Sequence, residues 1–385
     1  MKRHLVTLAM IAATPASAQL VPSLPPRIGA LPERLLNTVD GVVETAPKAL
    51  ETARLDRIAA LLRSSGGRVV RDDRGDAARA GEVVLTDPND AAIDALERDG
   101  FRTIERTEIE GLGVGYARLA IPAGIRLDHA LARARLRSPI VTADVIHFRS
   151  GDLEAVSAAI ATAGLVQSGP VVGMIDGGVS GGAVRQQGFA TGAPRPSDHG
   201  SAIAWLIGRG APGARVVAAD VYGSDPAGGG AVAIARAIGW LARADVGIVS
   251  ISLVGPPNPL LSRVIAAAQA RGMTIVAAVG NDGPAAPPAY PASYPGVVAV
   301  TGVDARGRVL IEAGRASHLD YAAPGAGFAA PDAKGRMEVV RGTSFAAPLV
   351  AARLAAVGRG QVDGEAVAGR RYGRGLVCGR CVQRR

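Results

Sequence analysis

Aromatic residues and cysteines are scarce in this chain. Only 3% of its 385 residues are aromatic and two are cysteines, whereas 50 are glycines and 48% are hydrophobic. An interior with few rings must be packed from Ala, Val, Ile and Leu, with backbones close together and many tight turns. The length suffices for two domains, and the hydrophobic content argues against a disordered chain.

The N-terminus has the layout of a cleavable signal peptide. Lys2 and Arg3 precede an apolar run over residues 5–13, and small residues follow at 16–18. The run is shorter than the ~20 residues that a membrane-spanning helix needs, and no later segment supplies such a helix. We therefore expect residues 1–18 to be removed and the remaining chain to be secreted or periplasmic, without a membrane span.

Positive charge exceeds negative charge without indicating a nucleic-acid groove. The formal net charge is +9, and loss of Lys2 and Arg3 leaves 41 basic against 34 acidic residues. Arginines are frequent over 126–137 and 370–385, but stacking aromatics are not interleaved with them. We expect a solvated surface there and no nucleic acid as a partner.

The two cysteines, Cys378 and Cys381, are too few for a metal site. In an oxidising compartment we expect them to form a small disulfide, since a thioredoxin-like redox role needs a βαβ context that the tail lacks. No acidic cluster compels a calcium site, although a structural calcium ion stays open. The sequence predicts no metal and no cofactor.

After the signal peptide, residues 19–81 form a Pro-rich and charged stretch that we interpret as a tether. Residues 82–150 show apolar runs in the order β-α-β-β-α-β, which is typical of a small ferredoxin-like α+β domain. The expected strands lie at 83–85, 101–109, 114–121 and 141–148, and the expected helices lie at 90–98 and 127–136.

Residues 151–360 alternate helices with short, wholly apolar strands. The strands are expected at 171–175, 216–221, 246–251, 274–279 and 297–303, and the helices at 201–207, 231–242 and 260–271. Such strands predict an α/β fold with a parallel sheet covered by helices on both faces. Ligand sites in these sheets lie beyond the carboxyl ends of the strands. A basic tail over residues 361–385 follows.

Four polar side chains stand where this sheet would gather its loops. Asp176 and Asn281 each follow a predicted strand, His199 begins a helix, and Ser344 precedes a helix whose start is marked by Pro348. A hydroxyl at a helix start lies near free backbone N–H groups, which favour a developing oxyanion, and the Asn281 amide could be a second donor. Each residue alone fits a turn or a helix cap, but together they predict a nucleophilic site.

The segments around these residues resemble the signature blocks of subtilisin-like serine peptidases, in that family's order of Asp, His and Ser. The most specific block is Gly342-Thr-Ser-Phe-Ala-Ala-Pro348, and the histidine block, residues 198–204, continues into an Ala-Pro-Gly-Ala turn. The resemblance covers about residues 165–357.

By the family's pattern, Asp176 orients His199, which takes the hydroxyl proton of Ser344. The serine then attacks the scissile carbonyl, and Asn281 with the backbone N–H of Ser344 holds the oxyanion. The resemblance implies a serine endopeptidase that acts on proteins or peptides as a monomer. It also implies a substrate-binding edge strand and a pocket wall, formed by Ser252, Leu253, Val254, Gly255 and Gly280.

The resemblance further implies that residues 82–150 are a propeptide. In this family such a domain assists folding and inhibits the enzyme until it is cleaved, here near residues 148–151. The chain departs from the family pattern in that Asp176 is followed by Gly, Ser201 stands where Thr is usual, and Val254 stands where Gly is usual. None of these changes removes a catalytic atom. The β-branched Val254 is expected to narrow the S1 pocket and favour small residues.

Two alternatives stay open. A catalytically silent protein could keep the subtilisin-like fold as an interaction surface, although all four site positions carry functional side chains. A Rossmann-type nucleotide-binding module is suggested by the glycine-rich residues 176–182 after a strand. These residues lack the dinucleotide-binding pattern, and no clear helix follows them.

Overall fold

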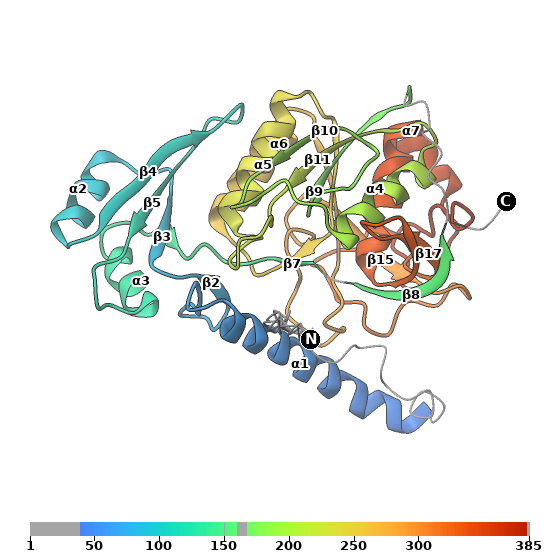
Figure 1. Cartoon of the computed structure of the whole chain (residues 1–385), viewed down its shortest axis with the longest axis horizontal. Helices are drawn as coiled ribbons and strands as arrows, with labels where there is room; N and C mark the ends of the chain where they lie inside the picture. The colour runs from blue at the N-terminus through green and yellow to red at the C-terminus, as the bar shows by residue number, and fades with distance from the viewer. Residues whose placement is uncertain (1–38, 150, 160–167, 383–385) are drawn as a thin grey trace, which may run out of the picture.

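The protein, as a computed structural model, is described over residues 39–149, 151–159 and 168–382. A small N-terminal α+β domain lies beside a larger α/β domain, and a long helix runs below the larger domain in this view (Figure 1). The predicted signal peptide, residues 1–18, lies outside the described residues.

The segment interpreted as a tether contains regular structure in its described part. Its elements are α1 (Val39–Ser64), β1 (Val69–Arg71) and β2 (Ala77–Arg79), and the two strands pair antiparallel. Ile58 of α1 is buried in one cluster with Val69, Ala77 and Ile146. Residues 39–79 thus differ from a tether, because apolar side chains of α1 pack against other parts of the chain.

The N-terminal domain has the predicted ferredoxin-like order. Its elements are β3 (Glu82–Thr86), α2 (Asp90–Arg98), β4 (Arg102–Ile109), β5 (Val114–Ala120), α3 (Leu127–Arg135) and β6 (Val141–Thr142). The strands pair antiparallel in the order β4-β5-β3-β6. The predicted strand at 141–148 is wrong in its extent. Residues beyond Thr142 leave this sheet and bond to the larger domain, where the Ala231 N–H donates to the Val145 oxygen at 3.0 Å.

The larger domain is built on a seven-stranded sheet. Its strands are β9 (Val171–Asp176), β10 (Ala183–Gly188), β11 (Arg215–Asp220), β12 (Ile248–Ile251), β14 (Thr274–Ala278), β15 (Val298–Val303) and β16 (Tyr321–Pro324). They run in the order β10-β11-β9-β12-β14-β15-β16, and every neighbouring pair is parallel. The predicted parallel α/β sheet is confirmed, while the two edge strands, β10 and β16, are not among the predicted strands.

Helices cover both faces of this sheet, as the sequence predicts. They are α4 (Asp198–Gly210), α5 (Ala231–Arg243), α6 (Pro259–Ala270) and α7 (Ala347–Glu365). Successive residues of a strand point to opposite faces, so Met174 of β9 packs in the cluster of α4 and α7, and Ile175 packs in that of α5 and α6. The N-terminal domain covers the outer side of α5 and α6, since its Leu119 shares a core cluster with Trp240 and Leu261.

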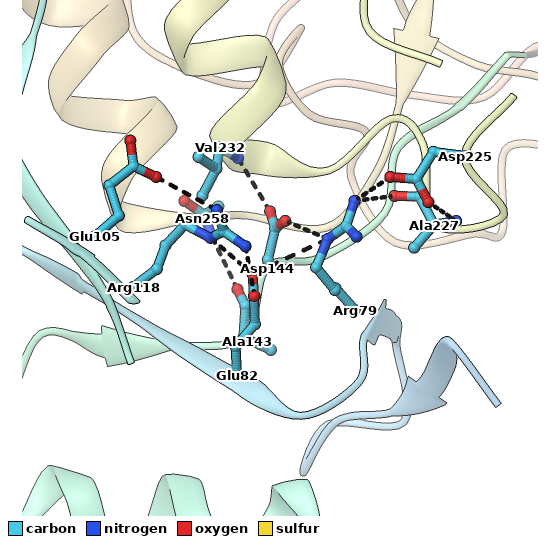
Figure 2. Close-up of polar contacts among 10 residues, drawn as sticks. All are labelled: Arg79, Glu82, Glu105, Arg118, Ala143, Asp144, Asp225, Ala227, Val232 and Asn258. Carbon is cyan, nitrogen blue, oxygen red and sulfur yellow. Dashed lines mark hydrogen bonds and ion pairs between the residues drawn. The ribbon is translucent and has the colours of Figure 1, made fainter. Parts of the chain in front are cut away.

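A network of charged groups joins the two domains (Figure 2). Arg79 of β2 pairs with Asp225 of the larger domain at 2.9 Å and lies 3.4 Å from Asp144. The Asp144 carboxylate accepts a hydrogen bond from the Val232 N–H at 3.0 Å, in the first turn of α5. Burial raises the pKa of Asp144 to about 6. The network continues through Glu82, Arg118 and Glu105.

Further strands and the C-terminal tail complete the larger domain. β8 (Asp152–Ala159), β17 (Ala326–Pro331) and β18 (Arg336–Arg341) form an antiparallel sheet in the order β17-β18-β8. In the tail, Val377 is fully buried in the core, and Cys378 and Cys381 form a disulfide. Over the described ranges, no helix is long and apolar enough to cross a membrane.

Candidate active site

The four predicted site residues are all presented at or near the ends of core elements. Asp176 is the last residue of β9, and Asn281 lies shortly after β14. His199 is in the first turn of α4, whose N-cap residue Ser197 fixes the start of the helix. Ser344 lies in a 3-10 turn, η3 (Thr343–Phe345), that leads into α7. Because β9 and β14 are parallel strands of one sheet, their carboxyl ends open at the same edge.

His199 and Asp176 form a buried pair. Nδ1 of His199 lies 2.9 Å from Oδ2 and 3.0 Å from Oδ1 of Asp176. The carboxylate is fully buried and also accepts the Gly177 N–H at 2.6 Å, while His199 is 7% exposed. A proton on Nδ1 that points to the carboxylate leaves Nε2 as an acceptor. Among the described residues, Nε2 has no hydrogen-bond partner.

Ser344 lies next to this pair. Its hydroxyl donates to the backbone oxygen of Ser252 at 3.2 Å, and the Ser252 hydroxyl donates to the backbone oxygen of Ser344 at 2.9 Å. The Phe345 ring packs on the imidazole of His199 with centroids 5.3 Å apart. The turn begins at Gly342, whose φ of 144° is rarely adopted by residues with side chains. In this state the serine hydroxyl is bonded to Ser252 and not to His199.

Asn281 is oriented by the same turn. Its side-chain oxygen accepts the Thr343 N–H at 2.9 Å, and the Thr343 hydroxyl donates to the Gly280 oxygen at 3.1 Å. Asn281 is 5% exposed. Since the oxygen is engaged by the residue before Ser344, the amide NH₂ group of Asn281 is left to donate elsewhere.

A segment of the chain itself, residues 145–149, lies in this site as an extended strand. β7 (Phe148–Arg149) pairs antiparallel with β13 (Leu253–Val254). On the other side of the segment, the His147 N–H donates to the Gly229 oxygen at 2.8 Å. The segment therefore has backbone partners on both of its edges.

The chain is also anchored just after residue 150. Gly151 approaches Phe345 so closely that a side-chain carbon added to it would lie 2.7 Å from the ring. On the other side, Arg149 pairs with Leu253, whose neighbour Ser252 is bonded to Ser344. Residues 149 and 151 are thus both held by neighbours of Ser344.

Comparison with known proteins identifies the family of this chain. A model of the subtilase family matches residues 168–362. Subtilisin BL from Lederbergia lenta is 32% identical over 216 residues, which cover 50% of this chain and 78% of that protein. The chain belongs to the subtilase family. Subtilisin E from Bacillus subtilis (strain 168) is 31% identical over 152 residues, which cover 38% of this chain and 39% of that protein.

Two solved structures of proteases have a similar fold. Fervidolysin from Fervidobacterium pennivorans, a keratinolytic enzyme related to subtilisin, superposes with a TM-score of 0.63 at 16% identity, over 81% of this chain and 62% of its own. The epidermin leader peptide processing serine protease from Staphylococcus aureus gives 0.57 at 16% identity, over 78% of this chain and 97% of its own. As a member of the subtilase family, this protein is a serine-type endopeptidase.

The predicted substrate-binding residues of this subtilase border the occupied cleft. Leu253 and Val254 pair with the extended segment, and Gly255 packs so tightly on it that an added side-chain carbon would lie 2.6 Å from the His147 ring. The same construction on Gly280 places a carbon 3.1 Å and 3.2 Å from the two methyl groups of Val254. The Val254 side chain therefore fills the space above Gly280, where the sequence predicts the S1 pocket.

Three residues of the cleft are missed by the sequence reasoning. The Tyr222 hydroxyl donates to the His147 oxygen at 2.6 Å, and the Arg149 guanidinium carbon lies 4.4 Å from the centre of the Tyr222 ring. His147 is fully buried, neither of its ring nitrogens has a partner among the described residues, and burial lowers its pKa to about 4. Tyr222 lies two residues after β11, and this place at the carboxyl ends of the strands was the sequence signal that could have identified it as a site residue.

Proposed function

We propose that this subtilase is an exported zymogen that hydrolyses peptide bonds through an acyl-enzyme on Ser344, and that it first cleaves its own chain. The observation that carries the proposal is the buried His199–Asp176 pair, with Nε2 unpartnered, beside a serine whose neighbours hold residues 149 and 151. Nucleophile, base and a peptide segment are thereby gathered in one place.

Each side chain has a defined task in this reaction. Asp176 keeps the Nδ1 proton of His199 in place and stabilises the imidazolium that forms. Nε2 takes the proton of the Ser344 hydroxyl as the oxygen attacks the scissile carbonyl, and then delivers that proton to the leaving amine. In the reacting state the hydroxyl turns from the Ser252 oxygen to Nε2. No cofactor is required for these steps.

The developing oxyanion needs donors on the side of Asn281. The orientation of this side chain by Thr343 supports its amide as one donor, and the backbone N–H of Ser344 is the other. Water then hydrolyses the acyl-enzyme with His199 again acting as base. The order of the triad in the chain is Asp176, His199, Ser344.

The N-terminal domain acts as the intramolecular inhibitor in this proposal. Residues 148–149, which follow this domain, pair with the edge strand that a substrate would use. After cleavage behind residue 150, the released N-terminal part can therefore still compete with substrates for this strand. Residues 1–18 direct export, and the mature enzyme is a secreted or periplasmic monomer.

An activity-based probe tests the proposal. A fluorophosphonate reacts with a serine only where a base activates its hydroxyl. The processed wild-type protein is expected to be labelled once, on Ser344, and to hydrolyse peptides. Ser344→Ala and His199→Ala are expected to remain unlabelled and inactive, whereas the control Ser317→Ala, at an exposed serine of the larger domain, should match the wild type. Absence of label and of hydrolysis in the processed wild type would favour a catalytically silent interaction protein.

A further inference from the structure

Side chains of the extended segment alternate between the larger domain and α1. His147 is fully buried against the larger domain, and Arg149 lies over Tyr222 of that domain. Phe148, between them, faces α1, where the Arg57 guanidinium lies 5.6 Å from its ring. This is the alternation of a strand, so the positions of 147 and 149 are set by their backbone pairing.

The Arg149 side chain occupies a place distinct from the S1 pocket. Its guanidinium carbon lies 4.4 Å from the centre of the Tyr222 ring, and a carbon added to Gly177 would lie 3.1 Å from its Nη1. Gly177 directly follows Asp176, whereas the S1 wall is formed by Gly280 under Val254. In the proposed cleavage after residue 150, residue 149 is the one before the residue that carries the scissile carbonyl.

The surroundings of this guanidinium carry negative charge. Asp176 and Asp220 end the neighbouring parallel strands β9 and β11 and are fully buried. The Asp220 carboxylate accepts backbone N–H groups of Arg195 at 2.7 Å and of Tyr222 at 2.9 Å. Within the described residues, neither carboxylate forms an ion pair with a lysine or arginine. Asp176 is paired with His199, and Asp220 is held by backbone N–H groups. Two carboxylates on neighbouring strands still favour a cation near them.

Tyr222 is held rigidly as a platform. Its backbone N–H is bonded to Asp220, and its hydroxyl is bonded to the backbone of the extended segment at His147. A planar guanidinium stacks on an aromatic face and stays weakly hydrated, whereas the ammonium group of lysine is compact and strongly hydrated. The platform therefore suits arginine better than lysine.

We propose that this subtilase selects arginine at the position before the residue that carries the scissile carbonyl, with the Tyr222 ring as the receiving surface. The substrate class is peptides with Arg followed by a small residue, as in Arg149-Ser150 of the chain itself. The inference rests on the proposed peptidase function and adds a specificity-determining residue to it.

Quenched fluorescent octapeptides with the sequence of residues 145–152 test this specificity. Position 149 is occupied in turn by Arg, Lys, citrulline, norleucine or Glu, and kcat/KM is measured with the processed wild-type enzyme. Citrulline matches arginine in shape and lacks its charge. We expect Arg to exceed citrulline on the order of fivefold, with Lys between them and Glu slowest. This comparison needs no variant enzyme.

Two variants assign the preference to the ring. Tyr222→Leu removes the ring and leaves the carboxylates of Asp176 and Asp220 in place, so it is expected to lower the Arg to citrulline ratio without abolishing it. Tyr222→Phe keeps the ring and should retain the ratio, with all peptides weakened alike by loss of the hydroxyl's hydrogen bond. Equal rates for Arg and citrulline in the wild type, or an unchanged ratio in Tyr222→Leu, would overturn the inference. Failure of the wild type to cleave any peptide would instead overturn the proposed function.

Discussion

The side chain of Val254 lies directly above Gly280 at the entrance of the predicted S1 pocket. A β-branched side chain is stiff about χ1 and cannot fold away easily. Val254→Gly is therefore expected to raise kcat/KM for peptides with Phe before the scissile bond, relative to Ala, by at least about tenfold, since each misfit methylene is worth ~1–3 kcal/mol. Profiling a peptide library varied at this position measures the ratio. If wild type and Val254→Gly give the same Phe to Ala ratio, Val254 does not shape the pocket.

Asn281 is the residue whose loss should affect the transition state most selectively. Asn281→Ala is expected to lower kcat by on the order of 10²–10³ with KM nearly unchanged, because an oxyanion donor acts mainly on the transition state. The fold should persist, and a thermal melt provides that control. An unchanged kcat with a raised KM would show that Asn281 binds substrate and is not the donor.

At the scale of elements, continuous apolar runs located the inner strands of the sheet well. β9 and β14 are buried along almost their whole length, which fits the central position that their apolar sequences predict. The edge strand β10 escaped because its sequence Ala-Val-Arg-Gln-Gln-Gly is polar and largely solvent-facing. The break between β6 and β7 was not predicted because Val141, Val145 and Ile146 give residues 141–148 the composition of one strand. The backbone partners of residues 145–147 lie in the larger domain and in β2.

Helix α1 lies in the segment interpreted as a tether from the sequence, outside the predicted propeptide at residues 82–150. Its buried Leu50 packs on Gly283, and its Arg57 forms an ion pair with Asp282, so α1 contacts the two residues that follow Asn281. Arg57 also lies over Phe148 of the segment in the cleft. Helix α1 lies outside the ferredoxin-like domain (Figure 1) and contacts both the extended segment and the loop that carries Asn281.

Removal of the buried contact should weaken this cover. Leu50→Ala is expected to lower the packing free energy between α1 and the larger domain by ~2–5 kcal/mol. The cleaved N-terminal part should then dissociate sooner, so that peptidase activity appears earlier after processing. The matched control is Leu55→Ala on the same helix, whose side chain is 44% exposed and should leave the time course unchanged. Identical time courses for Leu50→Ala and wild type would show that α1 does not hold the inhibitor.

At the scale of the whole molecule, His147 makes the association of the two domains depend on pH. Burial lowers the pKa of His147 to about 4, from an ordinary value of 6.5. Its backbone oxygen accepts the hydroxyl of Tyr222, and its ring has no charged partner within the described residues. His147 is neutral when the two domains are associated. Its contribution to the free energy of association is therefore full above pH 6.5 and is lost as pH falls through 4, and it amounts to roughly 3 kcal/mol. Asp144, whose pKa is raised to about 6, acts in the opposite sense, because its contribution is lost as pH rises through 6.

The difference between variants isolates the histidine. The dissociation constant of the cleaved N-terminal part is expected to rise on acidification from pH 6.5 to 4 more steeply in wild type than in His147→Leu, which cannot protonate. His129→Leu, at an exposed histidine, serves as the control and should follow the wild type. Parallel pH profiles for wild type and His147→Leu would contradict the assigned role.

The candidate site was accessible to sequence reasoning because each of its residues is fixed by a local signal. Asp176 ends a buried strand, His199 starts a helix, and Ser344 stands in a short block with Gly342 before it. The occupant of the cleft was less accessible, since the roles of His147 and Arg149 depend on pairing with residues about a hundred positions away. Local patterns carry no information on such long-range pairing.

The most direct test of the account is the intact mass and N-terminal sequence of purified wild-type protein beside Ser344→Ala. We expect wild type to yield two pieces, with the larger one beginning at Gly151, because Ser344 attacks the carbonyl carried by residue 150. Ser344→Ala should keep residues 149 and 151 joined, and Ser64→Ala should be processed like wild type. Normal cleavage between 149 and 151 in purified Ser344→Ala would contradict the claim that this serine is the nucleophile of a self-processing subtilase.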